Sequence, residues 1–400
     1  MSELHPDTAA VHAGRLEIPS NRASSPPLFQ ASSYEFADLE NVEEIYSGRV
    51  SGKIYGRYGG PNGAQLESAV AELEGAEAAA GAAAGMAAID ACLATTLDGA
   101  GEIVATGEAY GGTFALLEND YRKRGFGVHY VDQCDLDAVR GALERHRPKV
   151  LYLEALTNPL MHVADLPSLC TLAHGAGATV IVDATFATPV LLRSLDHGAD
   201  LVVHSLGKYI GGHGDVGAGV LAGKREPVER ARAYLARRGA TIPHFEAWLS
   251  LRGLRTLALR MERHSRNADA VAAFLAREPS VERVHHPSRS DHPQHDLAAR
   301  LYRRGTGGIV AFDLRDGAPA VRRFLKGHLQ TIAIVHSLGE VATTISYPTL
   351  SSHRMLPAET RRALGVGEGT IRISVGIEDP GDITRDLARA FAGLRERVRA

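Results

Sequence analysis

The sequence predicts an α/β protein built on a mainly parallel sheet covered by helices, followed by a smaller α+β region. Up to about residue 255, short apolar runs rich in β-branched residues alternate with segments of helical period. Beyond that point the rhythm becomes more mixed. Strands that are continuously apolar are buried on both faces, as in parallel sheets, and such sheets bind ligands beyond the carboxyl ends of their strands.

The expected strands of the main sheet are brief and bounded by Gly, Pro or Asp. They are EIVAT at 102–106, GVHYVD at 127–132, KVLYLE at 149–154, TVIVD at 179–183 and DLVVHS at 200–205, and the clearest helix between them lies at 165–176. Three of these strands end in Glu154, Asp183 and Ser205. We therefore expect these polar side chains to meet at the ligand-binding edge.

Residues 1–60 contain Pro19, Pro26 and Pro27 with no sustained period, so we expect an extended arm that contacts a neighbouring subunit. A helix should follow, with Asn62 as its N-cap and Gly75 as its stop. The Ala-rich stretch 76–88 is interrupted by Gly81 and Gly85, where a plain helix would gain nothing.

The predicted large domain covers residues 61–255 and the predicted small domain covers 256–400. A helical stretch is expected around 245–263, and apolar runs occur at 307–314, 331–338 and 370–376. The chain should end in an amphipathic helix. Its apolar face would comprise Ile383, Leu387, Phe391, Leu394 and Val398.

The composition excludes several classes of partner. A formal net charge of −3, with Arg and Glu interspersed, gives no electrostatic footprint for nucleic acid or an anionic membrane. The three cysteines, Cys92, Cys134 and Cys170, are widely spaced, so we expect buried thiols in a reducing compartment. No signal peptide and no run of roughly 20 apolar residues is recognisable, so we expect a cytoplasmic protein.

Lys208 stands out in the segment ADLVVHSLGKYIGGHGDVGAG, where it follows a predicted strand inside a glycine-rich turn. Partial burial lowers the pKa of a lysine, and the neutral amine can then condense with an aldehyde. A surface lysine in a flexible glycine loop is the alternative. A nucleotide-binding loop is disfavoured because no Ser or Thr follows the lysine and no GxGxxG motif opens a helix.

Asp183 ends the strand TVIVD, upstream of Lys208. A carboxylate at this place can pair with the protonated pyridine nitrogen of a cofactor. An N-cap or turn aspartate is the ordinary alternative.

The order and wording of these segments resemble the cystathionine/methionine-metabolism family of pyridoxal-phosphate enzymes. This family includes cystathionine γ-synthases, cystathionine γ- and β-lyases, methionine γ-lyases and homoserine-ester sulfhydrylases. The resemblance runs from about residue 8 to the C-terminus. It implies a fold-type I transferase with a seven-stranded sheet, pyridoxal 5'-phosphate as cofactor, no metal, and a homotetramer built as a dimer of dimers.

The resemblance also assigns the cofactor contacts. In HSLGKYIGGHGDVG it implies Lys208 as the lysine that carries the cofactor and Ser205 as a phosphate contact, while Asp183 becomes the partner of the pyridine nitrogen. In AAGMAAI it implies phosphate binding by Gly85 and Met86 at a helix start, where free N–H groups suit an anion.

Four further residues carry over on the same grounds. Tyr110, in EAYGGTF, would stack on the cofactor ring and act as an acid or base. Glu154 and Asn158, in LEALTNPL, would contact the cofactor, with Asn158 at its ring oxygen. Thr185, in DATF, completes this set.

The segment KIYGRYGGPN supplies Tyr55 and Arg57. The resemblance implies that both reach the phosphate in the active site of a neighbouring subunit. A planar guanidinium suits a phosphate because it donates two parallel hydrogen bonds.

Ser337, in HSLGEVA, and Arg372, in GTIRISVGIED, resemble the clamp for the substrate carboxylate. The alternative for Arg372 is a structural ion pair with Glu378 or Asp379.

Several positions depart from the family pattern. Ala84 stands where Ser is usual, Ala184 where Asn is usual, and Gly207 where Thr commonly precedes the lysine. We therefore expect weaker cofactor retention, at roughly 0.5–1.5 kcal/mol for each lost hydrogen bond. Gly112 replaces the Cys common in methionine γ-lyases, and Ala342 replaces a Glu that helps many relatives to read the far end of the substrate.

The expected activity is elimination or γ-replacement on a sulfur-containing or activated homoserine-type amino acid, of the cystathionine γ-lyase or γ-synthase kind. The runner-up is a specialised γ-substituting enzyme acting on an O-acyl-homoserine or an S-adenosylmethionine-like substrate. A non-catalytic small-molecule or metal-binding protein is the alternative from another class. The metal alternative rests on the loop HHPSRSDHPQHD, with His285, His286, His292 and His295, but its prolines spoil helical ligand spacing.

Overall fold

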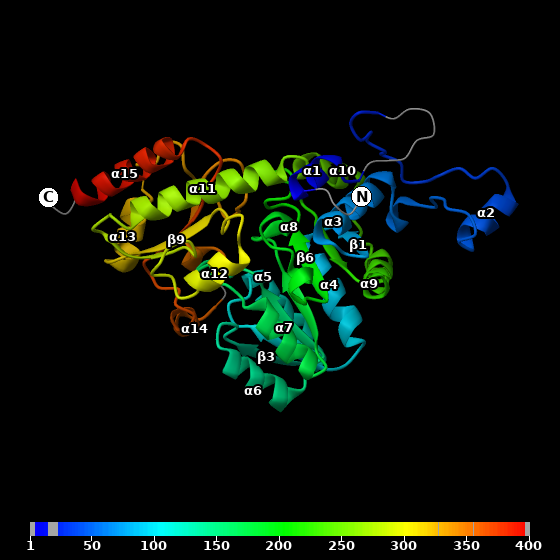
Figure 1. Ribbon diagram of the computed structural model, residues 1–400, viewed down its shortest axis with the longest axis horizontal. Helices are drawn as coiled ribbons and strands as arrows, with labels where there is room; N and C mark the ends of the chain where they lie inside the picture. The colour runs from blue at the N-terminus through cyan, green and yellow to red at the C-terminus, as the bar shows by residue number, and fades with distance from the viewer. Residues whose placement is uncertain (1–4, 15–22, 327, 355, 397–400) are drawn as a thin grey trace.

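The computed structural model describes residues 5–14, 23–326, 328–354 and 356–396. It contains two sheets with separate hydrophobic cores, and the long helix α11 (Leu257–Leu275) contacts helices packed against the first sheet and strands of the second (Figure 1). Of the residues named above, Pro19 and Val398 lie outside the described ranges. No helix among the described residues is long and apolar enough to cross a bilayer.

The first sheet has seven strands in the order β1-β7-β6-β5-β4-β2-β3. Only β7 runs antiparallel to its neighbours. The expected mainly parallel sheet is therefore confirmed. The strands are β1 (Ala78–Ala82), β2 (Glu102–Thr106), β3 (Gly127–Val131), β4 (Val150–Glu154), β5 (Thr179–Asp183), β6 (Leu201–Ser205) and β7 (Gly219–Gly223).

Helices cover both faces of this sheet because its strands carry apolar side chains on both sides. One core joins the sheet to α3 (Pro61–Glu74), α6 (Leu136–His146), α7 (Leu166–Gly175) and α10 (His244–Leu254). The other core joins it to α4 (Gly85–Leu97) and α9 (Arg225–Arg238). Two short helices, α5 (Gly111–Leu116) and α8 (Thr188–Leu191), follow the ends of β2 and β5.

The second sheet has five strands in the order β10-β11-β12-β9-β8. They are β8 (Val281–His285), β9 (Ile309–Leu314), β10 (Ala333–Ile334), β11 (Thr344–Ser346) and β12 (Thr370–Ser374). Its helices besides α11 are α12 (His295–Leu301), α13 (Gly317–Phe324), α14 (Ala358–Ala363) and α15 (Pro380–Glu396). The core on this sheet includes Phe312, Phe324 and Phe391, and Ile383, Leu387, Phe391 and Leu394 of α15 are buried as predicted.

The N-terminal arm joins the first core through α1 (Pro6–His12), which contacts α3 and α11. Helix α2 (Leu39–Tyr46) has no buried residue and lies apart from the rest of the chain in Figure 1. The prediction of an Asn62 N-cap was wrong, because the helix starts at Pro61 with Gly60 as N-cap. Instead, the Asn62 side chain accepts from Phe29 N at 2.8 Å and donates to Pro27 O at 2.8 Å, which fastens the arm to α3.

Other expectations need correction as well. The stretch 245–263 is two helices, since α10 ends at Leu254 and α11 begins at Leu257. The run 331–338 pairs with β11 only through β10, whose two residues are exposed. The Ala-rich stretch holds β1, followed by the start of α4 at Gly85. Cys92 and Cys170 are buried as expected, whereas Cys134 is only half-buried.

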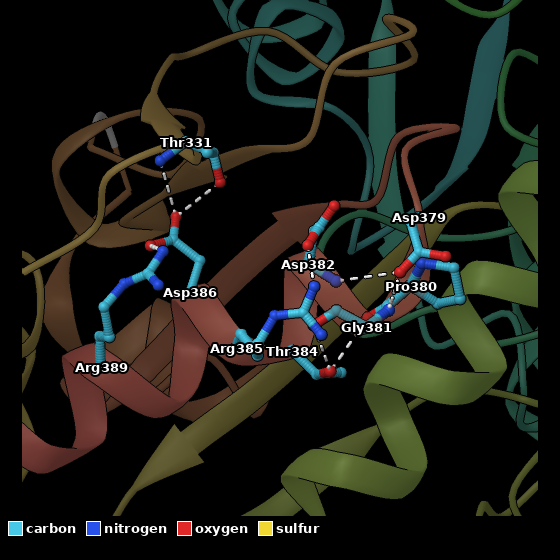
Figure 2. A network of polar contacts seen from close by, with 9 residues as sticks. All are labelled: Thr331, Asp379, Pro380, Gly381, Asp382, Thr384, Arg385, Asp386 and Arg389. Atoms are coloured by element: carbon cyan, nitrogen blue, oxygen red, sulfur yellow. Dashed lines mark hydrogen bonds and ion pairs between the residues drawn. The ribbon is translucent and has the colours of Figure 1, made fainter.

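Asp386 of α15 fixes the backbone at residues 330–332, where the run 331–338 begins (Figure 2). Its buried carboxylate accepts hydrogen bonds from the backbone N–H groups of Gln330, Thr331 and Ile332 at 2.8–2.9 Å. The Thr331 hydroxyl donates at 2.9 Å and Arg389 at 2.7 Å. These donors lower the pKa of Asp386 far below its usual range, against the effect of burial. The loop that follows therefore starts from a fixed point.

Candidate active site

Lys208 lies in the turn after β6, and its side chain points into a buried polar region. Its Nζ donates to Ser337 Oγ at 3.0 Å. Burial lowers the pKa of Lys208, and the positive charge of Arg372 lowers it further, while Glu340 opposes this. The neutral, nucleophilic form of the amine is therefore easier to reach here than in an exposed lysine.

The loop that carries Ser337 is packed tightly on the Lys208 turn. A Cβ atom at Gly339 would lie 2.7 Å from Tyr209 N, so only glycine permits this approach. Val341 N donates to Gly212 O at 2.9 Å. The two loops therefore hold each other at the predicted site.

Arg372 extends from β12 into the same region and is 3% exposed. Its guanidinium donates to Asn158 Oδ1 at 3.0 Å and to Ser337 O at 2.9 Å, while its buried Nε has no partner among the described residues. Burial lowers the pKa of Arg372 to about 10. The alternative ion pair with Glu378 is absent, because that carboxylate accepts from the Thr343 hydroxyl at 2.8 Å.

Asp183 and Glu154 end adjacent parallel strands and are paired in register. Burial raises the pKa of both carboxyl groups, and the charge of Asp183 raises that of Glu154 further. Asp183 Oδ1 accepts from Thr185 N at 2.9 Å, and the Tyr152 hydroxyl lies 3.5 Å from Oδ2. Thr185 Oγ1 in turn accepts from Ser205 N at 2.9 Å. Of the pair, Asp183 is partly exposed and Glu154 is buried.

Glu154 holds the segment that presents Tyr110. Its Oε1 accepts from Tyr110 N at 2.6 Å, at the residue that precedes α5. The Tyr110 ring is 45% exposed and lies over Gly112, where a Cβ atom would be 2.5 Å from Tyr110 Cε1 and 3.1 Å from Met86 Sδ. An open ring face is thus presented above the start of α4.

The amino end of α4 forms a cradle for an anion. A Cβ atom at Gly85 would lie 2.9 Å from Ser205 Cβ, and one at Gly219 would lie 2.4 Å from Ala84 O. These glycines allow β6 and β7 to approach the first turn of the helix. Its free N–H groups and dipole favour a phosphate there. Ala84, the N-cap, contributes no side-chain hydrogen bond.

Tyr55 and Arg57 do not join this cluster within the chain. Arg57 donates to Ala236 O at 2.8 Å and to the Tyr58 hydroxyl at 3.0 Å. Tyr55 and Arg57 line a separate cavity of about 450 Å³ with residues of 30–32 and 241–244. All the other predicted site residues lie in the region around Lys208.

The four histidines of the 285–295 loop have separate partners. His285 pairs with Asp313 at 2.7 Å, and His286 Nδ1 lies 2.8 Å from Ser288 Oγ. His292 Nδ1 accepts from Gln294 N, and His295 Nδ1 faces Pro287 O. Within the described ranges, the one trio with metal-ligand spacing lies elsewhere, on the strands' amino-end side of the first sheet, and comprises Glu102, His129 and His146.

Two residues in the site were missed from sequence. His353 is buried beside Ser352 Oγ at 2.9 Å, and burial together with the charge of Arg372 lowers its pKa to about 4. Glu340, in the Ser337 loop, is close enough for its charge to act on Lys208. Only the way the two sheets come together places these residues here. No local sequence pattern predicts His353, and the only local sign of Glu340 is the acid in HSLGEVA.

The described geometry also explains one departure from the family pattern. A Cβ atom at Gly207 would lie 2.4 Å from Val216 O, so the turn after β6 is built around a glycine. Ala342 is exposed and Ala184 is buried.

Comparison with known proteins gives the same classification throughout. The family model described as Cys/Met metabolism PLP-dependent enzyme matches residues 7–392. O-succinylhomoserine sulfhydrylase of Pseudomonas aeruginosa is 37% identical over 388 residues, covering 97% of this chain and 95% of the relative. L-methionine γ-lyase of Pseudomonas putida is 38% identical over 386 residues, covering 96% of each chain.

The fold agrees with solved structures as well. Cystathionine γ-synthase from Xanthomonas oryzae pv. oryzae, in complex with cystathionine, superposes with a TM-score of 0.92 at 35% identity, covering 98% of this chain and 99% of the other. The predicted fold class, cofactor and reaction class are thereby confirmed. The chain belongs to the Cys/Met-metabolism family of pyridoxal-phosphate-dependent enzymes, which carry out γ-elimination or γ-replacement on sulfur amino acids or acyl-homoserines.

Proposed function

We propose that Lys208 carries pyridoxal phosphate and that the chain is a cystathionine γ-lyase or γ-synthase-type enzyme. The observation that carries the proposal is the double link through Ser337. Its hydroxyl accepts from Lys208 and its carbonyl accepts from Arg372. A reactive amine and a buried guanidinium thus lie on the two sides of one residue, which suits an α-amino acid whose carboxylate binds Arg372.

The residues present fit the cofactor. The buried amine of Lys208 suits its aldehyde, and the α4 cradle with Ser205 suits its phosphate. Asp183 suits its ring nitrogen, because a protonated pyridine would relieve the cost of burying this carboxylate. When bound, pyridoxal phosphate supplies an electron sink for carbanion chemistry at the substrate α-carbon.

The protein groups would then bind the substrate and move protons. Arg372 would hold the substrate carboxylate in a bidentate contact. Lys208, displaced by the substrate amine, would remove the α-proton, release it, and then remove a proton from the β-carbon, so that the γ-substituent can leave. Tyr110, anchored by Glu154, would donate a proton to the departing γ-substituent. Access of water or of a thiol to the site would decide between elimination and replacement.

A specialised substrate remains the second candidate because Ala342 lacks an acidic side chain. An O-acyl-homoserine or an S-adenosylmethionine-like compound would make fewer demands on this position than cystathionine does in relatives with glutamate there.

We further propose that the active site is completed by a second copy of the chain, in a dimer of dimers. Tyr55 and Arg57 belong to an arm whose apolar side chains are unusually exposed. These include Leu28, Phe29, Leu39, Tyr46 and Val50, each between 37% and 79% exposed. Apolar groups presented in this way are typical of surfaces covered by a partner.

A substrate panel tests the activity. The holoenzyme would be given cystathionine, methionine, homocysteine, cysteine, O-acyl-homoserines and S-adenosylmethionine, and keto acid, ammonia and thiol products would be measured. We expect cystathionine cleavage, or cystathionine formation from cysteine and an O-acyl-homoserine. A cofactor-loaded protein that leaves the whole panel unchanged would refute the proposed function.

A further inference from the structure

Glu340 lies in the loop that is packed on the Lys208 turn. The residue before it, Gly339, donates from its N–H to Ser374 Oγ at 2.9 Å. The residue after it, Val341, donates to Gly212 O at 2.9 Å. With both neighbours fastened, the backbone of Glu340 is held in place beside the Lys208 turn.

The carboxylate of Glu340 rests over a glycine in the lysine turn. A Cβ atom at Gly214, which has φ +70°, would lie 2.9 Å from Glu340 Cδ and 3.0 Å from each carboxylate oxygen. Glu340 is half-exposed, and it forms no hydrogen bond or ion pair with any other residue in the described ranges. Its charge acts on Lys208. The site therefore contains a carboxylate that no hydrogen bond or ion pair with another described residue engages.

Glu340 is also within reach of a substrate side chain. Ser337, whose carbonyl binds Arg372, is three residues earlier in the same loop, and three residues span at most about 10 Å. An amino acid with its carboxylate at Arg372 and its α-carbon at Lys208 would extend its γ-substituent over a comparable distance. Glu340 is the only Asp or Glu between residues 331 and 344.

We propose that Glu340 forms a cation subsite that selects substrates whose γ-substituent carries an ammonium, guanidinium or sulfonium group. This rests on the proposed function, because it assumes that Arg372 binds the substrate carboxylate. A positive group near Glu340 gains Coulomb energy in the partly desolvated site, whereas a terminal carboxylate such as that of a succinyl ester is repelled. The subsite deepens the assignment from sulfur amino acids in general to those with a cationic γ-substituent.

The test is a binding series with three amino acids that lack a γ-leaving group and differ in their terminal charge. Lysine, norleucine and 2-aminoadipate would be titrated into the holoenzyme, with dissociation constants from calorimetry and cofactor absorbance. We expect lysine to bind about tenfold more tightly than 2-aminoadipate. In Glu340→Gln this ratio should fall to about threefold or less, with norleucine changed less than about twofold.

Glu144→Gln is the matched control, since it removes the same charge from an exposed position on α6. It should keep the wild-type ratio. Three results would overturn the proposal: a wild-type ratio near one, an unchanged ratio in Glu340→Gln, or an equal loss of affinity for all three ligands. The last result would mean that Glu340 only supports the loop.

A turnover measurement separates this inference from the activity on which it rests. In Glu340→Gln, kcat/KM for O-succinylhomoserine should rise several-fold relative to that for O-acetylhomoserine. One outcome is that the wild type processes the substrate panel while Glu340→Gln changes neither the ratio of kcat/KM values nor the binding ratio. In that case the cation subsite is refuted and the proposed activity stands. If the binding ratio responds to Glu340 but nothing on the panel is processed, the proposed activity fails.

Discussion

Arg372 connects the proposed carboxylate-binding part of the site with the Lys208 region through Ser337. Its guanidinium contacts Ser337 and Asn158, and its charge lowers the pKa of Lys208 from a neighbouring position. Burial makes its own charge costly, and one donor has no partner among the described residues. A substrate carboxylate would compensate both features.

Replacing Arg372 with lysine should therefore weaken substrate binding more than cofactor binding. A lysine keeps the charge but loses the planar pair of donors, at a cost of about 1.5–3 kcal/mol for a charged hydrogen bond. We expect KM to rise roughly 10- to 100-fold, while the absorbance of the bound cofactor is retained. Steady-state kinetics and cofactor titration measure the two effects, and equal losses in both would contradict the assigned role.

Ala84 and Gly207, on either side of the phosphate cradle, depart from the family pattern. Restoring the family residue should have opposite effects on cofactor affinity at the two positions. Ala84→Ser adds an N-cap hydroxyl at an exposed position and should tighten pyridoxal phosphate binding about two- to tenfold. Gly207→Thr forces a Cβ atom against Val216 O and should weaken it about tenfold or more. Dissociation of the cofactor from each variant gives the comparison. A gain in affinity from Gly207→Thr would show that the turn adapts.

The residues at strand ends were the part of the site that could be predicted from the sequence. Glu154, Asp183 and Ser205 were expected together because parallel strands present their carboxyl ends at one edge, and the structure places them there. The roles assigned to them remain predictions. Glu340 and His353 could not be predicted in this way. Each reaches the site through a loop, and the path of that loop depends on how the two sheets meet.

At the scale of whole elements, prediction succeeded where strands were β-branched and failed where they were not. The strands β2 to β6 follow the expected runs closely, since Val and Ile mark buried strands. Strand β1 is composed of Ala and Gly, which carry no such signal, and only its partner β7 defines it. The run 331–338 has strand composition, yet most of it is a loop, because Asp386 binds its backbone at Thr331 and Ile332 and the Lys208 turn binds the backbone just beyond it at Val341.

The anchoring of that loop predicts a specific stability effect. Asp386→Asn removes a buried charge that accepts four hydrogen bonds from residues 330–332 and should lower the free energy of unfolding by about 2–4 kcal/mol at pH 7. The pKa of Asp386 is depressed in the folded state. Its contribution is therefore full above the unfolded value of about 4 and is lost as pH falls below it.

Urea denaturation at several pH values measures this effect. The difference between wild type and Asp386→Asn should stay constant from about pH 8 to 5 and shrink below about pH 4. Asp382→Asn is the control, because Asp382 lies on the same helix but is exposed and pairs only locally with Arg385 (Figure 2). A difference that persists unchanged in acid would mean that packing, and not charge, is responsible.

On the scale of the whole molecule, the chain provides most of a site and presents the remaining two residues elsewhere. Arg57 is bound to Ala236 O and Tyr58 and lines a cavity apart from Lys208. The exposed apolar side chains of its arm would be costly in an isolated chain. Both features are accounted for if the arm of one copy completes the site of another, as we propose.

Complementation between two inactive variants tests this arrangement. Arg57→Ala would spoil the site of the neighbouring copy, whereas Lys208→Ala would spoil the site in its own chain. A mixed dimer then contains one site with both defects and one intact site, so co-expression with random pairing should restore roughly a quarter of the wild-type sites. Activity and bound cofactor would be measured on heterodimers isolated through two different affinity tags. If the arms are shared, every heterodimer contains one site untouched by both substitutions. Isolated heterodimers with no more activity than either parent would therefore show that Arg57 acts within its own chain or not at all.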